Sequence, residues 1–225
     1  DAFRFYMKKK RTMEFDEFCK LISKIENIPL PAEPSQLKMS PPFRDILQKK
    51  QRHIMKHAKK AGVMALFYPN NSKQTNLVLI LRKTYNGVHS AQVGFPGGKL
   101  EASDASLKEA AVRETFEEIG VPHHCIEVLR ELTQVYIPPS NFFVQPYIGI
   151  SRSTPKFLKQ DEEVEAIIEI DLRDFINEEN VVTKTVSTSY SLEVAVPAFN
   201  LNGHVVWGAT AMMLSEIKDL LKQLM

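Results

Sequence analysis

The sequence predicts an α+β protein in which a curved mixed sheet lies between helices and an N-terminal helical extension precedes it. Strand-like and helix-like stretches are mixed without a regular strand–helix repeat, which favours α+β over a purely parallel architecture. The 225 residues are 44% hydrophobic and 25% charged, as in an ordinary globular protein. This length predicts one core domain with an extension, and not two full domains.

We expect residues 1–60 to form a leader and the helical extension, and residues 61–225 to form the main domain. The first twelve residues are basic and aromatic, and "MEFDEFCKLI" from Met13 resembles a natural beginning. They contain no apolar core of a signal peptide, and no apolar run in the chain approaches 18 residues. Two widely spaced cysteines suit reduced thiols. Together these features predict a cytoplasmic protein that does not enter a membrane.

The extension shows helical periodicity near its start. Apolar side chains recur at helical spacing from Phe15 to Ile25, which predicts a first helix there. Residues 29–42 are rich in proline and are expected to be a connector. A second helix is expected from about Phe43 to Lys60, with Pro42 near its start.

Strand patterns dominate from Gly62 onward. "GVMALFYP" and "TNLVLILRK" flank "NNSKQ", which is typical of a hairpin. A helix is expected from Ser106 to about Ile119. Further strands are expected in "CIEVLRELTQVYI", "FFVQPYIGI", "EVEAIIEID" and "HVVWG". A short helix is expected in "DLRDFIN", a second hairpin in "VVTKTVSTSYSLEVAVPAF", and a C-terminal helix in residues 209–225.

Charge is distributed unevenly along the chain. Residues 1–60 hold 15 Lys and Arg against 7 Asp and Glu, although the whole chain carries only +2. A basic arm can attract an anionic ligand or nucleic acid, but it can also simply solvate helix faces. Because no module combines basic and aromatic residues, nucleic-acid binding is not the expected function.

The expected helix from Ser106 carries a dense group of acids. Glu114, Glu117 and Glu118 fall within an arc of about 100° on one helix face. Their mutual repulsion and their place near the helix C-terminus are both unfavourable, and a divalent cation would reverse both effects. Gly97 and Gly98 precede the helix and permit close approach of a ligand to the backbone. From spacing alone, a metal site and a solvated acidic face both remain open.

The stretch "GFPGGKLEASDASLKEAAVRETFEEIGV", residues 94–121, resembles a Nudix box, whose pattern is G-x5-E-x7-R-E-U-x-E-E-x-G-U with U apolar. The second half matches from Arg113 to Val121. The first half departs from the pattern, because Asp104 occupies the first acidic position and eight residues separate it from Arg113.

Flanking segments refine this resemblance. "LVLILRKTYNGVHSAQVGFPGGKLE", "PPSNFFVQPYIG", "EEVEAIIEIDL" and "VWGATAMML" resemble the coenzyme A pyrophosphatase branch of the family, in which a box one residue longer is common. Ala91 and Asn141 replace glycines that are usual in that branch.

The resemblance implies a Nudix-type α/β/α sandwich and a site for Mg²⁺ or Mn²⁺. The metal ligands would be Glu114, Glu117, Glu118 and the carbonyl of Gly98, with Arg113 orienting a box glutamate. Family members differ in the residue that serves as general base. Here Glu163 best matches the branch, with Glu162 and Glu114 as alternatives.

The implied reaction is hydrolysis of the diphosphate of coenzyme A, or of acyl-coenzyme A, to 3′,5′-ADP and 4′-phosphopantetheine. The candidate substrate-binding residues are Arg82, Lys83, His89 and Gln92. Alternatives are another nucleoside diphosphate derivative, such as ADP-ribose or NADH, and a Nudix-like binding module without catalysis. The module is less favoured because all three glutamates of the box helix are present. The protein is expected to be a monomer or a homodimer.

Overall fold

The computed structural model describes residues 13–83, 92–187 and 193–225. Its main sheet has eight strands, in which β1 pairs in parallel with β7 and every other pair is antiparallel. This confirms the expected mixed sheet. The strands are β1 (Lys59–Pro69), β2 (Thr75–Arg82), β3 (Val93–Gly94), β4 (Gly97–Lys99), β5 (Glu127–Glu131), β6 (Val135–Ile137), β7 (Phe142–Ile150) and β8 (Val164–Asp171).

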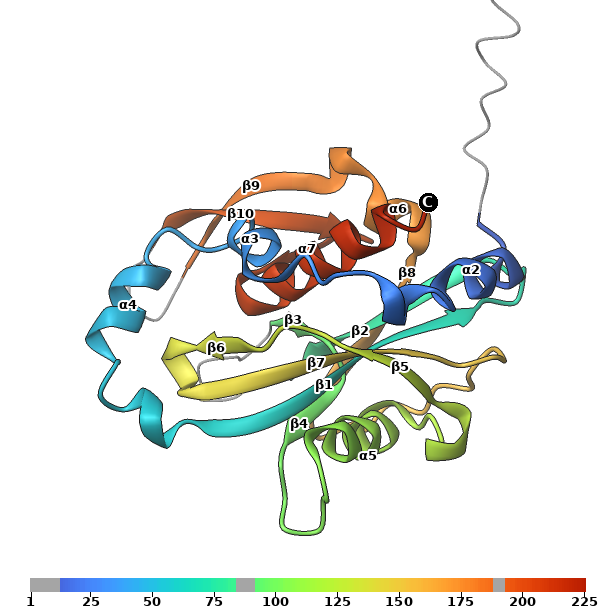
Figure 1. Ribbon diagram of the computed structural model, residues 1–225, viewed down its shortest axis with the longest axis horizontal. Helices are drawn as coiled ribbons and strands as arrows, with labels where there is room; N and C mark the ends of the chain where they lie inside the picture. Colours follow the sequence, from blue (N-terminus) through green and yellow to red (C-terminus); the bar gives the residue numbers. More distant parts are fainter. Residues whose placement is uncertain (1–12, 84–91, 188–192) are drawn as a thin grey trace, which may run out of the picture.

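A second sheet differs from the expectation of one sheet. It is antiparallel and three-stranded, and consists of β9 (Val181–Val186), β10 (Val194–Leu201) and β11 (His204–Trp207). The last helix, α7 (Gly208–Lys222), lies between this sheet and the main sheet (Figure 1). Helix α5 (Leu107–Ile119) covers the opposite face of the main sheet. The α/β/α layers implied by the resemblance are therefore present, with the small sheet added outside α7.

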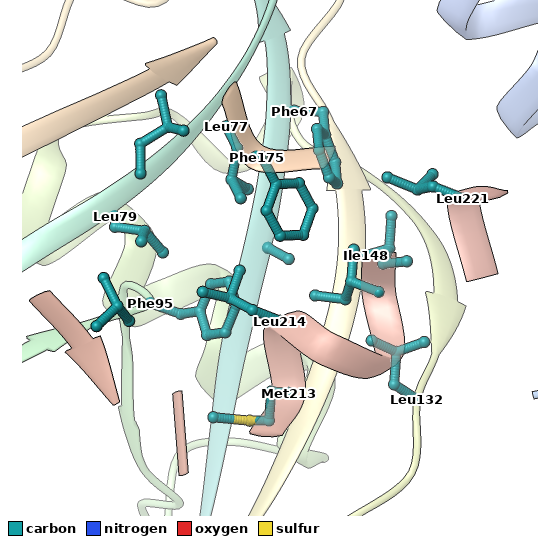
Figure 2. Packing of buried hydrophobic residues seen from close by; sticks show 14 of the residues in the cluster. Phe67, Leu77, Leu79, Phe95, Leu132, Ile148, Phe175, Met213, Leu214 and Leu221 are labelled. Atoms are coloured by element: carbon teal, nitrogen blue, oxygen red, sulfur yellow. The ribbon is translucent and has the colours of Figure 1, made fainter. Parts of the chain in front are cut away.

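Strand β1 supplies side chains to both faces of the main sheet, because successive residues of a strand point to opposite sides. Ala65 and Phe67 belong to the larger buried cluster on the α7 side, whereas Met64, Leu66 and Tyr68 belong to the smaller cluster under α5. Figure 2 shows the larger cluster, in which strand residues such as Ile148 and Leu79 face Leu214 and Met213 of α7. Every central strand is thus buried on both sides.

The extension contains three short helices, which are α2 (Phe15–Ile22), α3 (Ala32–Leu37) and α4 (Arg44–Lys50). Helix α6 (Leu172–Ile176) follows β8, and single 3₁₀ turns occupy Ile25–Asn27, Met55–His57, His123–Cys125, Pro138–Ser140 and Glu178–Asn180. Among the described residues, no helix is long and apolar enough to cross a membrane.

Two expectations for the extension were wrong. The second helix ends at Lys50 instead of Lys60, and β1 begins at Lys59, where it pairs with Phe142 of β7. Strand pairing therefore overrides the helical propensity of this lysine-rich segment. The expected proline-rich connector contains α3, because Pro34 lies in the first helical turn, where a missing amide hydrogen costs nothing.

Helix α3 is held on α7 by buried polar contacts. Gln36 donates from Nε2 to Glu216 Oε2 at 2.8 Å and to the carbonyl of Thr133 at 3.0 Å. The Glu216 side chain is fully buried and also accepts a hydrogen bond from the Thr133 hydroxyl. Ser215 donates to the carbonyl of Ser35 at 2.7 Å. The extension is therefore packed into the domain through specific hydrogen bonds.

We expect Gln36→Ala to lower the free energy of unfolding by about 1–3 kcal/mol, because a buried carboxylate loses one of its donors. Chemical denaturation followed by circular dichroism measures the change. Gln223→Ala, at an exposed position just after α7, is the matched control and should leave stability unchanged. Equal stability of the two variants would show that the Gln36 contacts do not couple the extension to the domain.

Candidate active site

The acidic helix α5 begins and ends as its sequence predicts. Ser106 Oγ accepts a hydrogen bond from the Glu109 amide as the N-cap, and Glu109 Oε2 accepts one from the amide of Ala105, the residue before the cap. At the other end Gly120 has φ 76°, a left-handed conformation that suits glycine. The helix also lies against β1, since a Cβ at Gly62 would stand 2.0 Å from the Leu107 carbonyl oxygen. These contacts fix the position of the acidic face.

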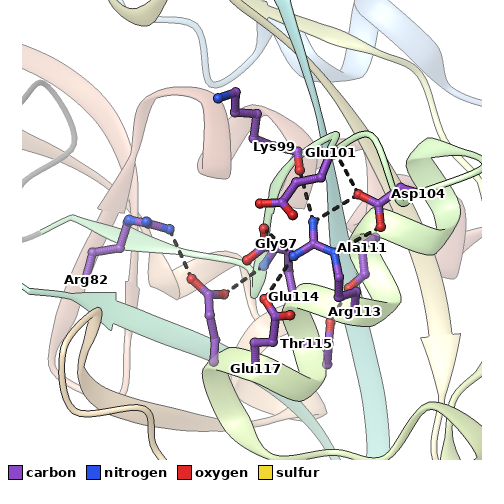
Figure 3. A network of polar contacts seen from close by, with 11 residues as sticks. Arg82, Gly97, Lys99, Glu101, Asp104, Ala111, Arg113, Glu114, Thr115 and Glu117 are labelled. Carbon is purple, nitrogen blue, oxygen red and sulfur yellow. Dashed lines mark hydrogen bonds and ion pairs between the residues drawn. The ribbon is translucent and has the colours of Figure 1, made fainter.

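Arg113 is the centre of the polar network in Figure 3. Its Nε and Nη2 bind the two carboxylate oxygens of Asp104 at 2.9 and 3.0 Å, and Nη2 also donates to the carbonyl of Lys99. Its Nη1 donates to Glu114 at 3.0 Å and to Glu117 at 2.9 Å. The hydrogen bonds from Arg113 hold the pKa of Asp104 below its usual range.

The departure from the family pattern at Asp104 therefore has a structural role. The shorter acid forms a two-bond pair with Arg113 and fixes the loop between β4 and α5 against the helix. Arg113 then holds two of the three acids of the helix face. This arrangement supports the expectation that Arg113 orients box glutamates.

Glu118 is the most deeply buried acid of the helix, with 2% of its surface exposed. Oε2 accepts the amide hydrogen of Gly97 at 2.8 Å, and Oε1 lies 3.4 Å from Arg82 Nη1. Burial raises the pKa of Glu118 to about 7, against the opposing effects of Gly97 and Arg82. The negative charges of Glu114 and Glu163 raise it further.

Glu114 lies directly against the glycine turn, which is the Gly97–Gly98 pair at the start of β4. A Cβ at Gly98 would come within 2.2 Å of Glu114 Oε1, so a side chain at this position would displace the Glu114 carboxylate. Burial raises the pKa of Glu114, Arg113 lowers it, and the charges of Glu117 and Glu163 raise it. Glu117 is the outermost of the three, with 51% of its side chain exposed.

These donors fit a hard divalent cation by their chemistry. Carboxylate oxygens and a backbone carbonyl are the ligands that such cations prefer, and positive charge would offset the burial of Glu118 and Glu114. As the side chains stand, no group of three His, Cys, Asp or Glu within the described ranges is arranged to hold a metal. The three acids instead bind protein donors. Arg113 Nη1 donates to both Glu114 and Glu117, and Glu118 accepts hydrogen bonds from the Gly97 amide and from Arg82.

The loop before β8 brings one more acid to the site. Both Glu162 and Glu163 donate their amides to Gln160 Oε1, at 2.8 and 2.7 Å, and the Glu163 carbonyl accepts from the Lys83 amide. Glu163 raises the pKa of Glu114 and of Glu118, and Glu162 is not among the causes at either group. Of the two candidate bases in this loop, Glu163 is therefore the one whose charge acts on the acidic face.

A cleft of about 570 Å³ opens beside the glycine turn, with Gly97 and Gly98 in its wall. Arg82 and Gln92 line it, and their role in substrate binding stays a prediction. Lys83 is not among the lining residues, and its Nζ lies 3.8 Å from Glu165 Oε2. His89 lies outside the described residues.

Several lining residues come from parts of the chain that are far from the acidic helix in sequence. Phe43, Arg44 and Leu47 belong to the extension, and Trp207 and Met213 belong to the C-terminal region. No local pattern marks Phe43, Arg44 or Leu47 in the sequence, and the basic composition of the extension is the one signal that points toward Arg44. Trp207 and Met213 belong to "VWGATAMML", one of the segments that resemble the coenzyme A pyrophosphatase branch. The cleft is therefore built from distant segments of the chain.

Comparison with known proteins assigns the family. A family model described as the NUDIX domain matches residues 58–185, more than half of the chain. The chain therefore belongs to the Nudix family. It is a Nudix hydrolase that acts on a nucleoside diphosphate derivative, and Nudix hydrolases generally use divalent metals.

Individual relatives agree with this assignment. Proteins named "Uncharacterized Nudix hydrolase NudL" from Yersinia pestis (strain Pestoides F) and from Yersinia pseudotuberculosis serotype O:1b (strain IP 31758) are each 28% identical over 151 residues, which cover 64% of this chain and 71% of the relative. The crystal structure of a Nudix hydrolase from M. smegmatis, RenU, has a TM-score of 0.51 at 12% identity. It covers 74% of this chain and 87% of that one, and shows a shared fold.

Proposed function

We propose that this chain hydrolyses the diphosphate of coenzyme A and acyl-coenzyme A to 3′,5′-ADP and 4′-phosphopantetheine or its acylated form. The observation that carries the proposal is the acidic face of α5, with Glu118 buried against Gly97 and Glu114 partly buried beside Gly98, at the wall of a large cleft. The choice of coenzyme A rests on the flanking segments of the sequence and on the longer box, in which Asp104 pairs with Arg113.

Glu114, Glu117, Glu118 and the carbonyl of Gly98 would hold Mg²⁺ or Mn²⁺. When bound, such ions neutralise diphosphate charge and lower the pKa of the attacking water. Arg113 keeps Glu114 and Glu117 in place through Nη1. Residues that fix these acids contribute by positioning, which phosphoryl transfer requires more than a protein nucleophile.

Glu163 is the proposed general base. Water forms a bond to one phosphorus, its proton passes to the Glu163 carboxylate, and the bridging oxygen leaves with the other phosphate. Arg82 lines the cleft at the buried end of the acidic face, where its positive charge favours the diphosphate. Glu162 and Glu114 remain the alternative bases.

The substrate proposal is tested by incubating the protein and Mg²⁺ or Mn²⁺ with coenzyme A, ADP-ribose and NADH in parallel, and separating the products by chromatography. We expect 3′,5′-ADP to form from coenzyme A faster than AMP forms from the other two compounds. Faster cleavage of ADP-ribose or NADH would select the alternative substrate class, and cleavage of none would favour a binding module. A preparation of Glu118→Gln serves as the control for contaminating hydrolases.

A further inference from the structure

The cleft reaches well beyond the acidic face and ends against the N-terminal extension. Its far wall includes Phe43, Arg44 and Leu47, together with Ile137 and Ser140 from the segment between β6 and β7. Helix α4 lies next to this segment. A substrate that fills the cleft therefore contacts the extension as well as the box.

Arg44 is a cation without an acidic partner within the described ranges. Its Nη1 donates to the carbonyl of Tyr136 at 2.7 Å, and no described carboxylate forms an ion pair with it. Partial burial lowers the pKa of the guanidinium, while Asp45 and Glu33 raise it. One hydrogen bond to a carbonyl leaves most of the five N–H donors of a guanidinium for a ligand.

The other described cations that line the cleft belong to its opposite end. Arg82 binds Glu118, and Lys99 directly follows the glycine turn. Arg44 is held on β6, which is separated from β4 and Gly98 by the strand order β4–β1–β7–β6. Three strand spacings amount to about 14 Å. A diphosphate bound at the acidic face of α5 is therefore too far from Arg44 to contact it. Arg44 can then bind a different group of the same ligand.

Ser140 adds a second unsatisfied group at this end of the cleft. The residue lines the cleft, and its hydroxyl oxygen is buried without a hydrogen-bond partner within the described chain, so the hydroxyl reaches a ligand in the cleft by rotating about χ1. A buried hydroxyl without a partner is uncommon and indicates a site for an additional donor or acceptor. A phosphate monoester supplies oxygens for both a guanidinium and a hydroxyl.

We propose that Arg44, assisted by Ser140, binds a phosphate monoester carried by the substrate away from its scissile diphosphate. In the proposed substrate this group is the 3′-phosphate. The inference rests on the proposed function and extends it, because it gives the extension a specific role in substrate selection. It also replaces Lys83, which pairs with Glu165 outside the cleft lining, as the second cation for the substrate's phosphates.

The test compares coenzyme A with 3′-dephospho-coenzyme A, which differ only in this phosphate. We expect Arg44→Gln to raise KM for coenzyme A about tenfold to hundredfold, the range for losing a charge-assisted hydrogen bond, with kcat unchanged. Kinetics with 3′-dephospho-coenzyme A should stay at the wild-type level. Arg44→Lys should recover part of the loss and Ser140→Ala should give a smaller one. Lys49→Gln, an exposed lysine on α4, should change neither substrate.

Equal effects of Arg44→Gln on both substrates would overturn the inference, because they would indicate a purely structural role through the Tyr136 carbonyl. No effect on either substrate would overturn it as well. If the wild type cleaves neither compound, the proposed function fails separately, and calorimetric binding of 3′,5′-ADP and of 5′-AMP decides the phosphate site. A preference for 3′,5′-ADP that Arg44→Gln abolishes supports the site, and equal affinities exclude it.

Discussion

Glu118→Gln is expected to lower turnover by about 10²–10³-fold or more while leaving the fold intact, because it removes a charged oxygen donor from the proposed metal site. The amide can still accept the Gly97 hydrogen bond, so the glycine turn keeps its position. Turnover is measured with coenzyme A over a range of Mg²⁺ concentrations. Glu109→Gln, earlier on the same helix, is the control and should retain turnover. Wild-type activity with unchanged metal dependence in Glu118→Gln would exclude Glu118 as a ligand.

The same substitution should stabilise the metal-free protein at high pH. Because the pKa of Glu118 is raised to about 7 in the folded state, folding favours its protonated form. The contribution of Glu118 to the free energy of unfolding is therefore complete below the pKa of this group in the unfolded chain, near 4.5. It is lost as the pH rises through the folded-state pKa of about 7. At pH 8 without metal, we expect the free energy of unfolding of Glu118→Gln to exceed that of the wild type by about 1–3 kcal/mol. We expect Mg²⁺ to reduce this difference. Thermal unfolding at pH 5 and pH 8, with and without Mg²⁺, measures both effects.

Glu163→Gln is expected to lower kcat by about 10²–10⁴-fold, the usual contribution of a general base, without changing the Mg²⁺ concentration required. The negative charge of Glu163 raises the pKa of Glu118 and of Glu114, which is consistent with a position near the acidic face. The pH–rate profile should also lose its acidic limb. Glu162→Gln, at the neighbouring position of the same turn, is the matched control and should behave like the wild type.

Two results would contradict this role of Glu163. A normal kcat in Glu163→Gln, combined with a low one in Glu162→Gln or Glu114→Gln, would transfer the base to one of the alternative residues. A higher Mg²⁺ requirement with a preserved acidic limb would instead indicate that Glu163 is a metal ligand.

The sequence predicted those parts of the fold whose pattern is local. The acidic helix was correctly bounded because Ser106 and Gly120 are strong start and stop signals. The hairpin of β1 and β2 was correct because two nearly continuous apolar runs flank a polar turn. The helix expected from Phe43 to Lys60 was too long because the pairing of Lys59 with β7 depends on residues more than 80 positions away.

For the site as well, residues whose arrangement depends on local spacing were predictable, and residues placed by long-range packing were not. The acids of α5 share one helix face, so their spacing alone brings them together. Arg82 and Lys83 could not be distinguished in the same way, because neighbouring extended residues point to opposite sides and the sequence does not show which side holds the cleft. Arg44 was missed because its place depends on how the extension packs across β6.

The hydrogen bond between Gln36 and Glu216 joins residues 180 positions apart and has a consequence for how the enzyme is made. Helix α7 supplies part of the cleft wall and the surface on which α3 packs. A growing chain on the ribosome cannot form either until α7 has been synthesised, so the sheet face that α7 covers stays exposed until then. Contacts at such long range slow folding and leave apolar surface open to aggregation. The complete cleft therefore forms only after α7 has been synthesised and has packed against the sheet and α3.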